Sequence, residues 1–368
     1  MKTPLTGRPL KNFQSRLLTW FRAHQRDLPW RASRDPYRIW VAEIMLQQTR
    51  IAAVTPYYEK FLARFPTVES LATAPQQEIL KLWSGLGYYS RARNLHAAAK
   101  EIVANHHANF PRDPAAALAL PGIGAYTAAA VLSIAYDVPL AVLDGNVARV
   151  LARIHALPGD LRAPRTWRKL TGTANHLLAR KSPGDWNQAL MELGEVICTP
   201  KSPRCLVCPV VQSCRAYAQG ITNEIPAPRR KRAPVSVTIA AAILLDPRNR
   251  TLLVKDPGAH DDVLFSRMWQ FPAIQVSHRA KPELEKYFAE SLSIPAIALE
   301  ELPSARHGVT FRNITLLPFL ARVPQLPKLP RSRAIPLKNL AKIPVSSATK
   351  KLANAAAVAA SAPKNFTP

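Results

Sequence analysis

Cysteine is scarce in this 368-residue chain: there are four, and all of them lie between Cys198 and Cys214. Long apolar runs are missing as well, since no stretch approaches the ~20 apolar residues that a membrane-spanning helix needs. The first eleven residues carry charge but no apolar segment, so no secretory signal is visible. These absences argue against membrane-spanning and disulfide-rich secreted classes, and they predict a cytoplasmic protein with reduced thiols.

Acidic side chains are also few. The chain has 24 Asp and Glu against 50 Lys and Arg, which gives a formal net charge of +26 at pH 7. Neutralising phosphates releases counterions, so such an excess of cations favours a polyanionic partner, with nucleic acid first. An alkaline protein with no such partner is the alternative that charge alone leaves open.

Strand-like alternation is nearly absent from residues 1–225. Apolar residues recur there at three- and four-residue spacing, in segments that Pro and Gly separate, which predicts one all-α domain. The helical segments with this spacing are Ile39–Val54, Gln76–Trp83, Arg91–Asn105, Thr127–Ala135 and Val147–Ala156.

The pattern changes after residues 226–234, a basic and proline-rich stretch that reads as an extended linker. Its cluster of arginines is either a solvated connector or a phosphate contact. Beyond it, Val235–Leu245 and Thr251–Lys255 are β-branched and apolar, and a turn-like Asp-Pro-Arg-Asn-Arg joins them. This combination predicts a β-hairpin.

Further strands are expected at Met268–Ile274 and Thr310–Leu320, with a helix at Lys281–Leu292 between them. We therefore predict a second domain of the α+β class over residues 235–355. The Ala-, Pro- and Lys-rich residues 356–368 predict a disordered tail.

The cysteines Cys198, Cys205, Cys208 and Cys214 follow the spacing C-x6-C-x2-C-x5-C. Four thiolates in one short loop can enclose one metal centre, either zinc or an iron–sulfur cluster. Structural zinc usually takes two C-x2-C pairs, whereas here one pair is flanked by single cysteines at unequal distances. The asymmetry favours a [4Fe–4S] cluster, with zinc as the alternative.

Leu120-Pro-Gly-Ile-Gly-Ala-Tyr-Thr lies between two helical patterns and places Gly122 and Gly124 two residues apart. Such glycines permit a tight turn, and the helix that follows presents free N–H groups to a phosphate. Residues 114–135 thus resemble a helix–hairpin–helix, a motif that binds the DNA backbone without reading sequence.

Two carboxyls stand out in the helical part. Glu43 has mostly apolar neighbours at helical spacing, so it is either a desolvated acid with a raised pKa or an acid at a rim. Asp144 follows an apolar run and precedes a helix, which predicts an N-cap that stabilises its ionised form. Together they would have the divergent protonation states of an acid–base pair, although each also has an ordinary structural explanation.

With the cysteine spacing, Ala-Glu-Ile-Met-Leu-Gln-Gln-Thr around Glu43 and Leu-Asp-Gly-Asn-Val around Asp144 resemble the two catalytic motifs of the MutY family of adenine DNA glycosylases. That family belongs to the helix–hairpin–helix, or endonuclease III, superfamily. The resemblance implies that Glu43 protonates N7 of adenine and that Asp144 stabilises the oxocarbenium-like sugar, with Tyr126 and Asn146 supporting Asp144. It also implies that the four cysteines hold a [4Fe–4S] cluster, which organises a basic loop against the DNA backbone.

Tyr126 separates two kinds of enzyme within this superfamily. The bifunctional members carry a lysine at its position, and without that amine no Schiff base forms with the sugar. We therefore expect a monofunctional, hydrolytic glycosylase. The competing hypotheses are a bifunctional pyrimidine glycosylase of the endonuclease III kind and a non-catalytic, cluster-bearing DNA binder or redox sensor.

The resemblance extends to residues that receive a base flipped out of the duplex and fill the gap it leaves. Leu-Pro-Trp-Arg resembles the pocket segment of the family, and Tyr88 with Gln48 resembles the pair that wedges into the base stack. The residues implied for the adenine pocket and the DNA wedge are Trp30, Arg31, Leu46, Gln48, Thr49, Tyr88 and Gln188.

The second domain resembles the MutT-like (nudix-fold) domain with which the family recognises 8-oxoguanine, through Trp269-Gln-Phe-Pro and Arg306-His307. It has no acidic nudix box, so we do not expect magnesium-dependent nucleotide hydrolysis. The residues implied for 8-oxoguanine recognition are His307, Thr310 and Phe311. Val309-Thr310-Phe311 stands where many members have Phe-Ser-His.

These features predict a base excision repair enzyme that removes adenine mispaired with 8-oxoguanine or guanine. Its expected partner is double-stranded DNA with such mispairs, and its expected cofactor is the [4Fe–4S] cluster. We expect a monomer, without membrane attachment, in the cytoplasm at the bacterial nucleoid.

Overall fold

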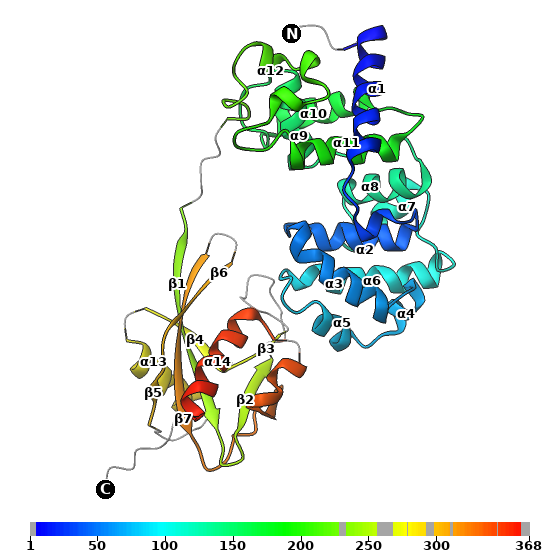
Figure 1. Ribbon diagram of the computed structural model, residues 1–368. Helices are drawn as coiled ribbons and strands as arrows, with labels where there is room; N and C mark the ends of the chain where they lie inside the picture. Colours follow the sequence, from blue (N-terminus) through cyan, green and yellow to red (C-terminus); the bar gives the residue numbers. More distant parts are fainter. Residues whose placement is uncertain are drawn as a thin grey trace. The chain divides into compact units, whose positions relative to one another are not determined.

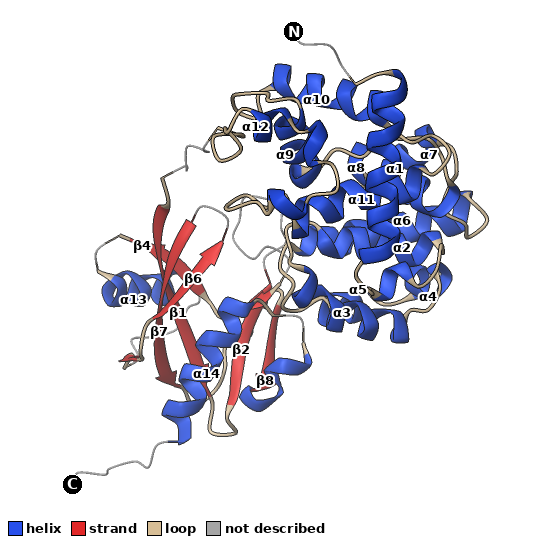
Figure 2. Cartoon of the chain, turned by 45° about the horizontal axis from the view of Figure 1, so that its top comes forward, coloured by secondary structure: helices blue, strands red, loops and turns tan. Residues whose placement is uncertain are grey.

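A computed structural model describes residues 5–227, 233–255, 268–277, 279–291, 298–309, 312–343 and 345–361. The chain forms two compact units, one of residues 1–74 and 88–230 and the other of residues 75–87 and 231–368. The long helices lie mainly in the first unit, and the sheet lies in the second (Figures 1 and 2). Among the described residues, no helix is long and apolar enough to span a membrane.

The first unit is helical, as expected for residues 1–225. Its helices are α1 Gly7–His24, α2 Pro36–Leu46, α3 Ile51–Arg64, α4 Val68–Thr73, α6 Tyr89–Asn105, α7 Pro114–Ala119, α8 Ala125–Tyr136, α9 Gly145–Ile154, α10 Pro164–Leu177, α11 Pro183–Val196 and α12 Arg215–Ala218. Short 3-10 turns lie at η1 Pro29–Arg31, η2 Cys205–Val207 and η3 Val211–Ser213.

Helices α8 and α11 run through the middle of this unit. Helix α8 packs against α2 and α11, and α11 packs in turn against α1 and α9 (Figure 1). The aromatic rings of Trp40, Phe61 and Trp186 are almost completely buried and build the core around them. The elements of the candidate site described below are therefore held by the best-packed part of the unit.

The segment Ile39–Val54, expected as one helical stretch, is two helices. Helix α2 ends at Leu46 and α3 begins at Ile51, because Gln48 between them takes a left-handed backbone with φ of 58°. The apolar spacing on both sides of this turn is helical, so periodicity could not reveal it. The break exposes the last carbonyls of α2, which need partners from elsewhere.

The predicted helix–hairpin–helix, residues 114–135, is present as α7 and α8. Gly122 has a φ of +76°, and a Cβ there would lie 2.6 Å from Cβ of Asn94, so only glycine fits. Gly124 differs from Gly122, because it is the N-cap of α8 in an extended conformation. Its lack of a side chain leaves the first N–H groups of α8 accessible instead.

In the second unit, eight strands of the described residues form one mixed sheet. Strands β1 and β7 pair in parallel over their whole length, from Val235↔Arg312 to Leu245↔Arg322, while β2 and β4 pair antiparallel to β1. The predicted hairpin is confirmed as β1 and β2. The strands are β1 Val235–Leu245, β2 Arg250–Lys255, β3 Trp269–Gln270, β4 Ala273–Val276, β5 Glu300–Glu301, β6 Ala305–Val309, β7 Arg312–Arg322 and β8 Ser332–Pro336.

Apolar side chains cover both faces of this sheet, which explains why β1 reads as a nearly continuous apolar run. Helix α13, Ala280–Ser291, packs on one face through Leu284 and Phe288. Helix α14, Ser347–Ser361, packs on the other through residues that include Leu352 and Ala356. The α+β class is confirmed.

Several boundaries differ from the prediction. Residues 356–361, expected in the disordered tail, continue α14, because alanine favours helix and Ala356 is completely buried against the sheet. The expected strand Met268–Ile274 is divided into β3 and β4, and β8 was not foreseen. The predicted segment Gln76–Trp83 forms α5, Gln76–Leu82, which belongs to the second unit together with 3-10 helix η4, Leu337–Lys342.

Candidate active site

A pocket of about 200 Å³ lies in the middle of the helical unit. Its walls come from η1, α2, the turn after α2, the N-termini of α8 and α9, and one face of α11. It is smaller than the cavities of roughly 300–1,000 Å³ that hold drug-sized ligands. Of the predicted site residues, Trp30, Arg31, Glu43, Leu46, Thr49, Tyr126, Asp144, Asn146 and Gln188 line this pocket.

Glu43 projects from α2 into the pocket with only 6% of its surface exposed. Its Oε2 accepts a hydrogen bond of 2.8 Å from the Tyr126 hydroxyl. Burial raises the pKa of Glu43 to about 7, against the lowering effect of the Tyr126 hydrogen bond, while the nearby Asp144 adds repulsion. Glu43 is therefore a carboxyl that gains and loses its proton near neutral pH.

Tyr126 has a different partner from the one expected. We expected it to support Asp144, but its hydroxyl lies on Glu43 and 3.2 Å from Sδ of Met191. Burial, together with the neighbouring Glu43 and Asp144, raises the pKa of Tyr126 well above its usual value. Tyr126 therefore stays protonated near neutral pH, and its hydroxyl remains a hydrogen-bond donor.

Asp144 is the N-cap of α9, as predicted, and its Oδ1 accepts the Val147 backbone N–H at 2.7 Å. The N–H groups of the cap favour the ionised form, as expected, but burial outweighs their effect. Burial raises the pKa of Asp144 despite the opposing effects of the Val147 and Asn146 backbone N–H groups and of Arg149. The pKa of both carboxyls is thus raised, and they differ in their hydrogen-bond donors: a tyrosine hydroxyl for Glu43 and backbone N–H groups for Asp144.

Asn146 supports Asp144 through its backbone, while its side chain points elsewhere. Its Oδ1 accepts a hydrogen bond of 2.9 Å from Arg149, and its Nδ2 donates to Oε2 of Glu195 at 3.3 Å. Arg149 also donates to the backbone oxygens of Gly194 and Cys198, at 2.8 and 2.9 Å. These bonds fix the first turn of α9 against the end of α11.

Glu192 was not foreseen, although it is the most buried acid in the pocket, with 1% of its surface exposed. Arg26 Nε donates to its Oε1 at 2.6 Å, and Arg31 donates to its Oε2 at 2.8 Å. Burial alone would raise the pKa of Glu192, but these two hydrogen bonds and the adjacent positive charges hold it below its usual value. The Arg31 guanidinium also stacks over the Phe21 ring, so it is fixed from two sides.

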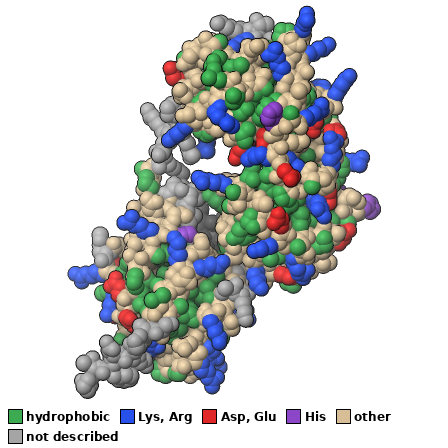
Figure 3. All heavy atoms as spheres, in the orientation of Figure 1, with side chains coloured by type: hydrophobic (Ala, Val, Ile, Leu, Met, Phe, Trp, Pro, Cys, Tyr) green, Lys and Arg blue, Asp and Glu red, His purple; other side chains and the backbone are tan. Residues whose placement is uncertain are grey.

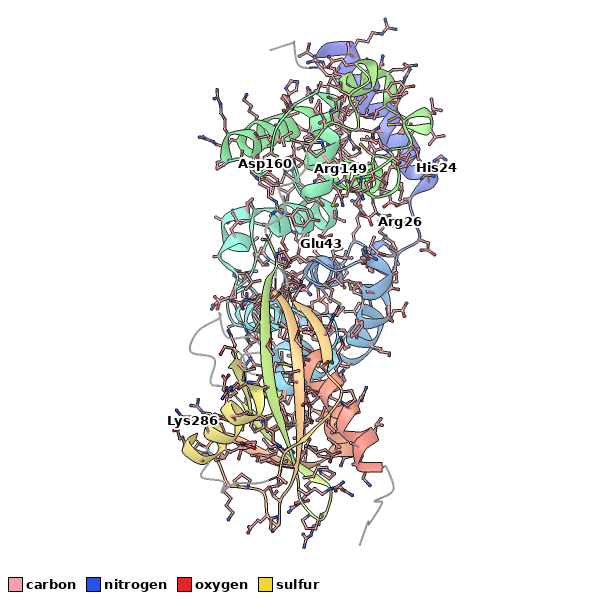
Figure 4. All side chains as sticks on the ribbon, turned by 90° about the vertical axis from the view of Figure 1, so that its left-hand side faces the viewer. His24, Arg26, Glu43, Arg149, Asp160 and Lys286 are labelled. Atoms are coloured by element: carbon pink, nitrogen blue, oxygen red, sulfur yellow. The ribbon has the colours of Figure 1, made fainter. Side chains whose placement is uncertain are left out.

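The signal for Glu192 was its position. It lies four residues after Gln188 on α11, which places both side chains on the same helix face. Nothing in the sequence indicates that Arg26 and Arg31 converge on it. Figure 4 labels Arg26, Glu43 and Arg149, which lie around the middle of the helical unit.

Gln48 and Tyr88 do not line the pocket. Both are exposed and both have left-handed backbones, with φ of 58° and 47°. Such conformations are uncommon for residues other than glycine and cost energy, so the surrounding structure must impose them. The predicted wedge pair thus lies outside the pocket.

The four predicted cysteines are partly buried around η2 and η3. Arg153, itself 1% exposed, donates to Sγ of Cys198 at 3.3 Å and to the Thr199 carbonyl at 2.7 Å. Burial, with repulsion from Cys198, Cys214 and Cys205, raises the pKa of Cys208 to about 12, against the lowering effect of the Val210 backbone N–H. In the described part of the chain, no three His, Cys, Asp or Glu side chains lie close enough to hold a single metal ion.

In the second unit, His307 lies on β6 opposite Ile314 of β7. Burial, with Lys351 nearby, lowers the pKa of His307. Thr310 and Phe311, the other residues predicted for 8-oxoguanine recognition, lie outside the described residues.

Residues 41–174 match the model of the HhH-GPD superfamily of base excision DNA repair proteins. The adenine DNA glycosylase of Mus musculus is 33% identical, over 92% of this chain and 77% of its own length. The structure of a thermostable thymine-DNA glycosylase is similar to 57% of this chain and 97% of its own, with 32% identity and a TM-score of 0.52. A trapped endonuclease III–DNA covalent intermediate shares the fold over 59% of this chain and 99% of its own, at 22% identity and a TM-score of 0.50.

These matches fit a helical unit that has Glu43, Tyr126 and Asp144 in one pocket, and that also contains a helix–hairpin–helix and a loop with four cysteines. The helix–hairpin–helix core predicted from the sequence is confirmed. The chain belongs to the adenine DNA glycosylase family.

Proposed function

We propose that this enzyme hydrolyses the N-glycosidic bond of adenine mispaired with 8-oxoguanine or guanine, after the base has been flipped from the duplex. The observation that carries the proposal is the pair of buried carboxyls in one small pocket. Glu43 titrates near neutral pH, and Asp144 is bound by backbone N–H groups. Such a pair can supply one proton donor and one anion to the same reaction.

Glu43 would act first, as the general acid. A protonated Glu43 donates its proton to N7 of the base, so that adenine leaves as a neutral purine and not as an anion. The Tyr126 hydroxyl orients this carboxyl, and Arg31 beside it lies at the pocket wall. The volume of the pocket suits a single base.

Asp144 would act on the sugar. As the glycosidic bond breaks, positive charge develops on the sugar ring, and an ionised carboxylate stabilises that charge. Water then adds to the sugar and leaves an abasic site. Because Tyr126 stands where a lysine would form a Schiff base, the enzyme does not cut the strand.

The cysteine loop fits a [4Fe–4S] cluster in its donor set. Burial and repulsion from neighbouring cysteines raise the pKa of Cys205, Cys208 and Cys214, and bound iron would stabilise their thiolates. Cys198, Cys205, Cys208 and Cys214 would hold it, and the cluster would supply iron–thiolate bonds that order the loop. Lys201 and Arg204 of this loop would then meet the DNA backbone.

Several exposed groups would hold the duplex. The N-terminus of α8 offers N–H groups to one phosphate at the helix–hairpin–helix. Lys and Arg side chains are spread over the face of the helical unit and outnumber the acidic ones (Figure 3). His307, Thr310 and Phe311 of the second unit would contact the base opposite adenine.

The deciding experiment measures adenine release from duplexes that pair adenine with 8-oxoguanine, guanine, cytosine or thymine, under single-turnover conditions. We expect release opposite 8-oxoguanine and guanine, with strand breaks only after alkali. Strand cleavage without alkali, with a borohydride-trapped adduct, would identify a bifunctional lyase instead. Binding of the mispaired duplex without any release would identify a non-catalytic binder.

A further inference from the structure

The turn between α2 and α3 is held by one buried side chain from another helix. Arg91, at the third residue of α6, has 9% of its surface exposed. One of its terminal nitrogens donates to the carbonyls of Ile44 and Met45, each at 2.9 Å, and to that of Gln47 at 2.5 Å. These are carbonyls at the end of α2, which have no partner within the helix.

The other terminal nitrogen of Arg91 donates to Oγ1 of Thr49 at 3.3 Å. The guanidinium also lies 5.5 Å from the centre of the Tyr88 ring, in the arrangement of a cation–π contact. One planar group thus contacts both sides of Gln48 and the ring of Tyr88.

Arg91 thus lies beside two residues with strained backbones. Gln48 and Tyr88 both have φ near +50°, the first in the turn and the second as the N-cap of α6. A left-handed backbone at a residue other than glycine persists only where other contacts impose it. Arg91 supplies such contacts at both places.

We propose that Arg91 is a positioning residue, which fixes Gln48 and Tyr88 in the conformation that enters the base stack when adenine is flipped. The inference rests on the proposed function, because it needs a duplex from which a base is removed. Arg91 touches neither the base nor the sugar. It stabilises the free enzyme in the shape that the DNA requires, so less order has to be created on binding.

A fork-shaped guanidinium is required for this role. Five N–H groups in one plane reach the carbonyls of α2 and Thr49 at once, whereas a lysine ammonium concentrates its charge at one point. Burial lowers the pKa of Arg91 only to about 10, so the group keeps its charge at neutral pH. Arg91→Lys therefore preserves the charge and removes the geometry.

The test uses 2-aminopurine in place of the target adenine, in an Asp144→Asn background that prevents base removal. The fluorescence rise on binding reports unstacking of the base. We expect Arg91→Lys to lower this amplitude severalfold, and to slow adenine release by about tenfold to a hundredfold in the otherwise unmodified enzyme. Lys100→Met, which removes an exposed charge from the same helix, should change neither.

A double-mutant cycle separates positioning from general destabilisation. If Arg91 acts through Tyr88, the effect of Arg91→Lys on release should shrink to below about threefold in a Tyr88→Ala background. Thr49→Val, which removes one acceptor of Arg91, should reproduce a smaller part of the effect. Full fluorescence amplitude in Arg91→Lys, or an undiminished effect beside Tyr88→Ala, would overturn the proposal.

Hydrogen exchange of the Gln48 and Thr49 amides in the free protein tests the positioning role of Arg91 without measuring catalysis. We expect faster exchange in Arg91→Lys and unchanged exchange in Lys100→Met. If the unmodified chain releases no adenine, the proposed function fails, while this measurement still judges the role of Arg91. If it releases adenine and exchange is unchanged in Arg91→Lys, only the positioning role fails.

Discussion

The helical unit and the sheet unit bury different kinds of side chain. Among the described residues, the helical unit buries Glu43, Glu192, Arg91, Arg149 and Arg153, whereas the sheet unit buries one charged group, Asp246, at the turn after β1. Burying a charge is costly unless partners compensate for it. The helical unit accepts that cost at the pocket, where the reaction is proposed, at the cysteine loop, and at the turn that Arg91 holds.

This contrast assigns different tasks to the two units. In the proposed function the buried charges of the helical unit perform the reaction, while the sheet unit, whose two faces bury mainly apolar side chains, contacts the opposite base. Substitutions in the first unit should therefore change whether adenine is removed. Substitutions in the second should change opposite which base it is removed.

The largest expected effect comes from the two carboxyls. Glu43→Gln removes the proton donor and Asp144→Asn removes the anion, so each should slow adenine release about a thousandfold or more. Affinity for the mispaired duplex should stay within about threefold, because neither change disturbs the phosphate contacts. Single-turnover release and equilibrium binding measure the two separately, with the exposed Glu59→Gln as control. Near-normal release in either variant would contradict the assignment.

The cysteine loop should give the next largest effect. Cys208→Ser would remove one cluster ligand, lower the iron content and weaken duplex binding about tenfold or more, since the basic loop loses its order. Iron analysis and binding measurements check this result. The neighbouring Val207→Ser makes a similar change at a residue that is 63% exposed and carries no thiol, and it should leave both values unchanged. Full iron content in Cys208→Ser would exclude that cysteine as a ligand.

A third test uses pH. Because Glu43 must be protonated and its pKa is about 7, adenine release should fall as pH rises through 7. Well above that value the decrease should approach about tenfold per pH unit. Single-turnover rates measured from pH 5.5 to pH 9 test whether adenine release falls as pH rises. A rate that increases with pH over this range would show that Glu43 acts as a base.

The smallest expected effect concerns the second unit. Thr310→Ala should reduce the ratio of release rates opposite 8-oxoguanine and guanine by about threefold to tenfold, through loss of one hydroxyl. The rate opposite guanine should stay the same, which distinguishes recognition from damage to the fold. Thr315→Ala, on β7, is the matched control. An unchanged ratio would remove Thr310 from the recognition site.

The sequence predicted local chemistry well. The N-cap role of Asp144 followed from an apolar run, an acid and a helical pattern in adjacent residues, whereas the ligand role of the four cysteines stays a prediction from their spacing. The sequence did not predict contacts between distant segments. Tyr126 and Glu43 are 83 positions apart, and no pattern in either segment indicates that their side chains meet.

The backbone conformation of single residues was harder to predict than their local chemistry. The left-handed Gln48 divides an otherwise helical stretch, and no glycine or proline announces the break. The end of the chain gave the opposite error. The alanines in residues 356–361 suggested a tail, but they belong to α14, which packs on a face of the sheet. That face exists only in the tertiary structure.

The burial of Glu43 also has a consequence for the folding equilibrium. Its pKa of about 7 lies above the 4.5 of an unperturbed glutamate, so the folded chain holds this proton more tightly than the unfolded chain does. Unfolding between these values therefore releases a proton, and the free energy of unfolding decreases as pH rises through this range. The contribution is most favourable below pH 4.5 and is lost above pH 7. Glu43→Gln, which cannot ionise, should therefore melt at a higher temperature than the natural chain at pH 8, so the residue proposed as the general acid also makes the folded chain less stable there.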